Sequence, residues 1–267
     1  MKKLILGLSA LVTLFSACSK TDDVATTPVT ATTNYILPKT LTTVNAVNGS
    51  SSTTQITYNG NKIIQSIDGT TKEVYTYTGD LITKVEKINA NVVSRTTDYV
   101  YNSSNDLISS LQLSTGNTYK TKIVYTYNSD GTIGYTESNV DISPVLETIR
   151  NIGKLTILNG NIIKREYQTP VFSGNINGNI STNEYDTKNS FAKNILGFSK
   201  LYEFTGANGQ NNLIKTTSVS SSSYNGVNNP SNTTITTHSF LYNIDNYPTE
   251  QKNFYNGNLE STSQYTY

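Results

Sequence analysis

The sequence has little of the chemistry that catalytic and metal sites need: its 267 residues include one cysteine, one histidine and no tryptophan. A single histidine excludes a His-based metal cluster, and a Ser-His-Asp triad would have to use His238. HExxH, GxSxG and phosphate-binding glycine loops are all absent from the sequence. We therefore expect a protein that is not an enzyme and that binds no metal or other cofactor.

The sequence has no excess of charge of either sign, because 20 Lys and Arg are balanced by 19 Asp and Glu, which gives a formal net charge of +1. A nucleic-acid-binding protein would show a basic stripe, so the balance excludes nucleic acid as a partner. No apolar run reaches the roughly 20 residues that a membrane-spanning helix needs. The longest, Leu4–Ala17, is too short.

The remaining polar groups point to structure rather than to a site. His238 lies in Thr236–Phe240, which reads as a strand, so a structural role is favoured over a catalytic one. The segment Asn243–Asn246 contains amide and carboxylate side chains like those in half of a calcium-binding loop, but the other ligands are missing. Paired carboxylates can hydrolyse glycosides, yet the sequence gives no reason to pair any two of the scattered candidates, Glu147, Glu166, Glu184 and Glu203.

The N-terminal 18 residues have the pattern of a lipoprotein signal peptide. Met1-Lys2-Lys3 supplies the positive charge, the apolar run follows, and Ser16-Ala17 precedes Cys18. We expect residues 1–17 to be removed and Cys18 to be lipidated, which leaves no thiol for a disulfide or a redox centre. The Thr-rich segment that follows, within 18–43, buries too little apolar surface to fold and is predicted to be a flexible tether to a β domain over 44–267.

The residues just after the cysteine carry a resemblance. Cys18-Ser19-Lys20-Thr21-Asp22-Asp23 resembles the tether of Bacteroidetes surface lipoproteins, in which a lysine and paired acids act as an export signal to the outer leaflet. The resemblance assigns that role to Lys20, Asp22 and Asp23. It implies a lipid-anchored protein of the outer membrane that faces outward.

A tyrosine-rich unit recurs along the rest of the chain. Its clearest copies are Tyr75-Thr76-Tyr77, Tyr99-Val100-Tyr101 and Tyr125-Thr126-Tyr127, each followed by a polar turn and then by aliphatic residues. Recurrence at 20–50 residues indicates an array of one supersecondary unit. Because strand side chains alternate, Tyr-x-Tyr places two rings on one face, and the Asn-Gly and Asp-Gly pairs suit tight hairpin turns.

Each unit is therefore a predicted β-hairpin, and the array is an all-β antiparallel meander that forms a large twisted sheet. Whether the sheet stays open or curls into a barrel is left undecided by the sequence. We expect Tyr77, Tyr101 and Tyr127 on one sheet face, with the first tyrosines of each unit beside them. Weaker copies occur near Tyr58, Leu158, Tyr242 and Tyr255.

The repeat also resembles a degenerate YD repeat of the RHS type. Together, the signal, the tether, the loose hairpins and the terminal Tyr265-Thr266-Tyr267 resemble a group of Bacteroidetes lipoproteins of unknown function. Asn183–Phe191 fits as well, although Ser190 stands where proline is expected. The resemblance implies a β-sheet and a surface address, and it supplies no activity.

Three stretches interrupt the predicted meander. Phe191, Ile195 and Phe198 recur as on one helical face, which predicts a short helix near 187–198, packed over an open end or face of the sheet. Residues 138–153 are predicted to be a loop. Ser218–Asn232 is predicted to be a long hairpin tip.

Two functions follow from this reading. The first is a non-catalytic structural or interaction role at the cell surface, with an envelope protein as partner. The alternative is glycan capture, in which Tyr77, Tyr101 and Tyr127 stack on sugar rings. Many sugar platforms use tryptophan, which this chain lacks, so the tyrosines are expected first of all to pack the repeat itself.

Overall fold

The computed structural model describes residues 34–203 and 209–267. Residues Tyr35–Tyr267 form one compact unit. The predicted signal peptide, the lipidated Cys18 and the export residues Lys20, Asp22 and Asp23 lie outside the described residues.

Seventeen β-strands and one 3₁₀ turn make up the described part of the chain. They are β1 (Thr40–Asn45), β2 (Ser51–Asn59), β3 (Lys62–Asp68), β4 (Thr71–Thr78), β5 (Leu81–Asn89), β6 (Val92–Tyr101), β7 (Leu107–Ser114), β8 (Tyr119–Tyr127), β9 (Ile133–Asp141), β10 (Glu147–Leu158), β11 (Asn161–Gln168), β12 (Asn175–Asn189), η1 (Phe198–Lys200), β13 (Asn211–Tyr224), β14 (Val227–Asn228), β15 (Asn232–Tyr242), β16 (Pro248–Tyr255) and β17 (Asn258–Thr266).

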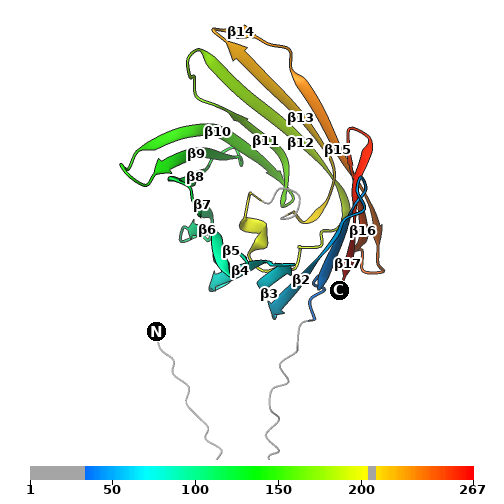
Figure 1. Ribbon diagram of the computed structural model, residues 1–267. Coiled ribbons are helices and arrows are strands. Elements are labelled where there is room, and N and C mark those ends of the chain that lie inside the picture. The colour runs from blue at the N-terminus through cyan, green and yellow to red at the C-terminus, as the bar shows by residue number, and fades with distance from the viewer. Residues whose placement is uncertain (1–33, 204–208) are drawn as a thin grey trace, which may run out of the picture. The chain divides into compact units, whose positions relative to one another are not determined.

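The strands close into a barrel (Figure 1). Neighbours in sequence pair antiparallel, and β17 returns to β1, where Leu41 lies opposite Tyr265. The two-residue β14 pairs only with the end of β13, which also pairs β15, so sixteen strands form the ring. The antiparallel all-β fold is as predicted, and the twisted sheet, which the sequence left either open or closed, is a closed barrel. Closure pairs the two edge strands that an open sheet would leave exposed.

The repeat itself contains a device that bends the sheet. The register shifts at Tyr58, Tyr77 and Tyr101, the last tyrosine of its unit in each case. Such a shift is a β-bulge, which bends its strand and increases the local twist. Repeated around the sheet, these bulges supply the curvature that brings β1 and β17 together.

The repeat tyrosines share one face of the sheet, as expected, and closure turns that face into the barrel. Tyr75, Tyr99 and Tyr125 are buried there, Tyr77 and Tyr101 pack against the same core, and Tyr127 is 38% exposed. The second tyrosines also bond through their hydroxyls to the backbone of the strand before, where the Tyr77 hydroxyl accepts from the Ile63 nitrogen and the other two donate to carbonyls. Tyr101 donates to Ile82 at 2.8 Å and Tyr127 to Leu107 at 3.1 Å. The repeat therefore joins its strands through side chains as well as through the ladder.

Removing one of these hydroxyls tests the contact. We expect Tyr101→Phe to lower the free energy of unfolding by about 1 kcal/mol, the net value of a typical hydrogen bond. Tyr224→Phe, at a tyrosine with 54% of its side chain exposed, is the control and should change it by less than about 0.5 kcal/mol. Urea unfolding measures both variants. Equal stabilities would show that the hydroxyl contact contributes nothing.

Residues 190–203, between β12 and β13, fold back into the barrel and are called the plug here (Figure 1). Ile195, Phe198 and Leu201 of the plug are buried against the inward side chains of the wall. The backbone is anchored too: Leu196 donates from its nitrogen to Asn61 and accepts at its carbonyl from the Tyr77 hydroxyl.

The predicted helix near 187–198 is wrong. β12 continues to Asn189, a series of turns follows, and the only helical turn there is η1 at Phe198–Lys200. The turns close through i to i−3 bonds such as Ile195 to Ala192, and Gly197, with φ of +74°, stops any longer helix. The spacing of Phe191, Ile195 and Phe198 reflects their burial inside the barrel, whereas the prediction placed them over an open end or face of the sheet.

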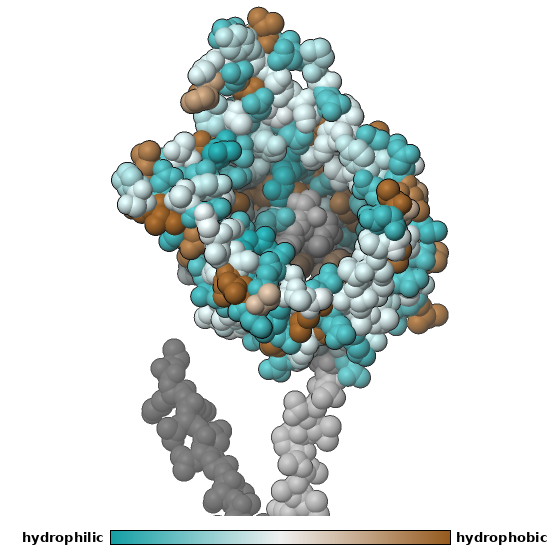
Figure 2. Space-filling view, in the orientation of Figure 1, coloured by the Kyte–Doolittle hydropathy of each residue, from teal (hydrophilic) through white to brown (hydrophobic). Residues whose placement is uncertain are grey.

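The outer face of the barrel wall carries charged and polar side chains, with exposed aliphatic residues such as Val100, Val124 and Ile180 among them. Val85 and Tyr99 are buried inward, so their neighbours Lys84 and Asp98 point outward and pair across β5 and β6. The Lys84–Asp98 ion pair measures 3.9 Å, and two other strand pairs are joined in the same way, by Lys154–Glu166 at 3.9 Å and Lys215–Glu184 at 2.7 Å. Figure 2 shows hydrophilic and intermediate residues over the visible surface, with hydrophobic ones scattered among them.

Among the described residues, no helix is long and apolar enough to cross a membrane.

Other predicted boundaries differ from the structure. β1 begins at Thr40, inside the segment 18–43 predicted as a tether. Residues 138–153 are mostly strand, because β9 and β10 continue as a hairpin past the barrel ring (Figure 1). Ser218–Asn232 does hold a hairpin tip, but β13 extends to Tyr224 before the chain turns.

Candidate functional site

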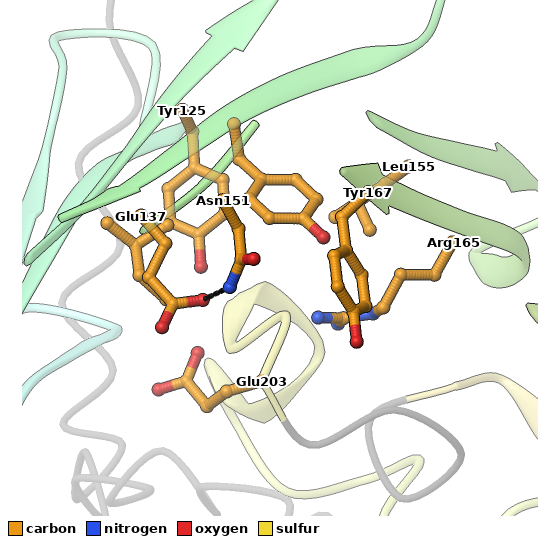
Figure 3. A pocket seen from close by; sticks show the side chains of 9 residues that line it. Tyr125, Glu137, Asn151, Leu155, Arg165, Tyr167 and Glu203 are labelled. Atoms are coloured by element: carbon orange, nitrogen blue, oxygen red, sulfur yellow. Dashed lines mark hydrogen bonds between the residues drawn. The ribbon is translucent and has the colours of Figure 1, made fainter. Parts of the chain in front are cut away.

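The candidate site is a cavity of about 210 Å³ inside the barrel, between the plug and the strands β8 to β11 (Figure 3). Its walls combine aromatic, charged and aliphatic side chains. They are Ile123, Tyr125, Tyr135, Glu137, Asn151, Leu155, Arg165, Tyr167 and Glu203. Glu203 belongs to the plug, and the other eight belong to the wall.

Strand alternation brings the wall residues together. Tyr135 and Glu137 are two residues apart on β9, and Arg165 and Tyr167 are two apart on β11, so each pair points inward. Between them on β10, Gly153 makes room for the ring of Tyr135. A Cβ at position 153 would lie 2.4 Å from that ring and from the Glu166 carbonyl.

The polar groups of the cavity are partly engaged with one another. The Asn151 amide donates to Glu137 at 3.0 Å. The Arg165 guanidinium donates to the backbone carbonyl of Tyr202 in the plug and lies over the Tyr135 ring, 5.9 Å from its centroid. This cation–π contact and hydrogen bond tie the plug to β9 and β11.

Glu203 brings a carboxylate from the plug to the cavity. Its side chain is accessible to water in the lumen, yet the surrounding wall partly desolvates it. That desolvation raises the pKa of Glu203, and the Tyr99 hydroxyl, together with Arg165 and Arg95, opposes the rise. Burial beside the same carboxylate raises the pKa of the Tyr99 phenol.

The raised pKa predicts a pH dependence of stability. Between the ordinary Glu pKa near 4.5 and its raised value, the folded chain binds more protons than the unfolded one. The contribution of Glu203 to stability is therefore greatest at acidic pH and falls as pH rises through that window. The stability of Glu203→Gln should not show this decrease with rising pH. The variant should therefore be more stable than the wild type at pH 7, and the difference should shrink towards pH 4.

Urea unfolding at pH 4, 5.5 and 7 measures the effect. Glu184→Gln, on the outer face, serves as the matched control and should not reproduce it. Parallel pH profiles for the wild type and Glu203→Gln would contradict the prediction.

The tyrosines expected to stack on sugars lie elsewhere in the lumen. The hydroxyls of Tyr77, Tyr101 and Tyr127 are engaged with the plug and the wall; that of Tyr127 also meets the Tyr202 hydroxyl at 3.1 Å. This placement accounts for them as packing elements, and stacking of a glycan on their rings stays a prediction. His238 lies on β15, with Nδ1 2.7 Å from the Asn253 side chain.

The structure separates the four scattered glutamates. Glu203 joins Glu137 at the cavity, whereas Glu166 and Glu184 take part in ion pairs on the outer face and Glu147 pairs with Lys122 at 3.1 Å. Asn243 at the calcium-like segment accepts from the nitrogens of Asp245 and Tyr247 within its own turn. Within residues 34–203 and 209–267, no group of three acidic, histidine or cysteine side chains is placed to hold a metal.

Comparison with solved structures finds the same fold in a porin-like protein from Bacteroides vulgatus. The two share 14% sequence identity with a TM-score of 0.57, over 87% of this chain and 99% of that one. A porin-like protein from Bacteroides uniformis matches with 10% identity and a TM-score of 0.49, over 86% of this chain and 96% of that one. No protein family and no curated protein matches the sequence. At this identity, the likeness concerns the barrel fold alone.

Sequence reasoning missed most of the cavity residues. Glu137, Asn151 and Arg165 were not singled out, because charged and amide residues on strands usually face water. A signal was present in the pattern Tyr135-x-Glu137 and Arg165-x-Tyr167, where a charged residue shares the face of a tyrosine. That signal identifies a polar lumen only once the sheet is known to be closed.

Proposed function

We propose that this chain is a lipid-anchored protein of the outer membrane whose plugged barrel stands in water and serves a non-catalytic interaction role. The single observation that carries the proposal is the set of lysine–carboxylate pairs on the outer face of the wall. In this arrangement the lipid on Cys18 holds the barrel at the membrane, and residues 18–34 join the two.

The outer wall would be a poor lipid-facing surface. A bilayer-spanning barrel presents an apolar band about 25 Å tall, on which a lysine at the midplane costs about 2–4 kcal/mol. Here Lys84, Lys154 and Lys215 lie in the interiors of their strands and on three sectors of the barrel. Their partner carboxylates point outward with them. Water, rather than hydrocarbon, is the solvent that suits this face.

The lumen supports an interaction role rather than conduction. Barrels of 16 strands are wide enough for an aqueous channel. In this barrel the plug fills part of that space and is fixed to the wall through Leu196, Phe198 and Tyr202. The porin-like description belongs to the solved neighbour, and the plug favours binding over passage for this chain.

Cysteine labelling tests the placement of the wall, because Cys18 is the only native cysteine and it is expected to be lipidated. Lys84→Cys on β5 and Glu184→Cys on β12 each place a thiol on the outer face of the barrel. In membranes from cells that express the lipidated chain, both should react with a membrane-impermeant maleimide without detergent. Ser110→Cys, at a side chain with 4% exposure in the lumen, is the unreactive control.

Two outcomes would contradict the proposal. Protection of both outer thiols until detergent is added would place the wall in the bilayer. Retention of Cys18→Ser in the membrane fraction would show that the lipid is not the anchor. Labelling of intact cells, compared with permeabilised ones, reports whether the barrel faces outward.

The cavity supports glycan binding as a second candidate function. Three tyrosine rings and four polar side chains converge there, which is the composition of a small-ligand pocket. This site differs from the one expected from the repeat tyrosines.

A further inference from the structure

We infer that the luminal cavity binds one ring of a neutral, polyhydroxylated ligand, that is, a monosaccharide unit. This inference rests on the proposed interaction role of a water-immersed barrel and assigns its ligand class. It places recognition at the interface between the plug and β8 to β11, where Glu203 faces Glu137 and Arg165.

Charge around the cavity disfavours an ionic ligand of either sign. Glu137 lies on one side, Glu203 on the plug and Arg165 on another side, so charges of both signs line one small space (Figure 3). A cation attracted by the carboxylates would meet the guanidinium, and an anion attracted by the guanidinium would meet two carboxylates. A neutral ligand pays neither penalty.

Hydroxyl groups match the lining because each both donates and accepts. The carboxylates offer acceptors, the guanidinium offers donors, and the Asn151 amide offers both. Glu137 already receives one bond from Asn151, which fixes the pair in place for a ligand hydroxyl. Polar groups that a ligand removes from water discriminate against a ligand that cannot pair them.

Ring faces and size limit the ligand to one ring. Tyr125, Tyr135 and Tyr167 present aromatic surface to the cavity, and Tyr167 is 36% exposed, so solvent reaches it. The volume of about 210 Å³ holds roughly seven waters at about 30 Å³ each. It lies below the 300–1,000 Å³ of drug-sized pockets. A longer glycan would leave its other rings outside.

The test uses the chain from residue 18 with Cys18→Ser and a series of sugars that share one ring. Ligand-observed NMR compares glucose with glucosamine, which carries an ammonium group, and with glucuronate, which carries a carboxylate. Galactose, mannose, xylose and N-acetylglucosamine extend the neutral set. We expect at least one neutral sugar to bind, and to bind better than its charged counterparts.

Variants locate the site. Tyr167→Ala should weaken binding about tenfold, through loss of one stacking face. Tyr167→Phe keeps the ring and should retain binding, and Tyr224→Ala removes an exposed tyrosine at the end of β13 as the matched control. Glu137→Gln, which removes a charge but keeps a hydrogen-bonding group, should shift the preference towards the anionic sugar.

Several results would overturn the inference. They are no binding by any sugar, tighter binding of a charged sugar by the wild type, an unchanged affinity in Tyr167→Ala, and cleavage of a glycoside offered in place of the free sugar. The cysteine labelling above is independent of all four. Reactive outer thiols with no sugar bound would leave the proposed function standing and refute only this ligand class.

Discussion

Phe198→Ala is expected to lower the free energy of unfolding by about 3–5 kcal/mol, the usual cost of truncating a buried phenylalanine. Phe198 begins η1 and is 8% exposed, in the core that the plug forms with the wall. For a unit of this size the loss corresponds to a fall in Tm of roughly 10 °C. Phe198 packs in the core that the plug shares with the wall, so its truncation leaves a cavity between the two.

Phe172→Ala is the matched control, because the side chain of Phe172 is 80% exposed. It should change stability by no more than about 0.5 kcal/mol. Urea and thermal unfolding of the three proteins measure the difference. Equal stability of Phe198→Ala and the wild type would show that the barrel wall is stable without the plug.

Gly197→Ala is the second substitution with a large expected effect. Position 197 has φ of +74°, which costs an alanine about 1–2 kcal/mol. Its Cβ would also lie 2.9 Å from the Asp80 carbonyl oxygen and 3.2 Å from the Ile82 nitrogen. Both are backbone atoms of the wall, so the plug has to move away. We expect a total loss of about 3 kcal/mol, with faster proteolysis within residues 190–203.

Gly226→Ala separates the two causes. Gly226 has φ of +80°, but a Cβ there would meet nothing within 4 Å. This variant should lose only the conformational part, about 1–2 kcal/mol, without increased cleavage of the plug. Equal losses in the two variants would mean that the close approach of Gly197 to β5 has no energetic consequence.

The arrangement of the repeat could be read from the sequence, and the plug could not. Tyr-x-Tyr followed by a polar turn predicts a hairpin, because alternation and turn chemistry are local. The segment of Phe191, Ile195 and Phe198 has helical spacing, yet Gly197 and the contact with Tyr77 decide its path. Those contacts join residues over 100 positions apart, which no local pattern records.

From the sequence alone, the antiparallel hairpins, their turns and the shared sheet face of the repeat tyrosines could be predicted. These depend on residue type, period and local backbone preference. Only the tertiary structure decided that the sheet closes, because β1 meets β17 through curvature summed over many bulges. Closure in turn made Glu137, Arg165 and Glu203 neighbours, since a cavity exists only where wall and plug face each other.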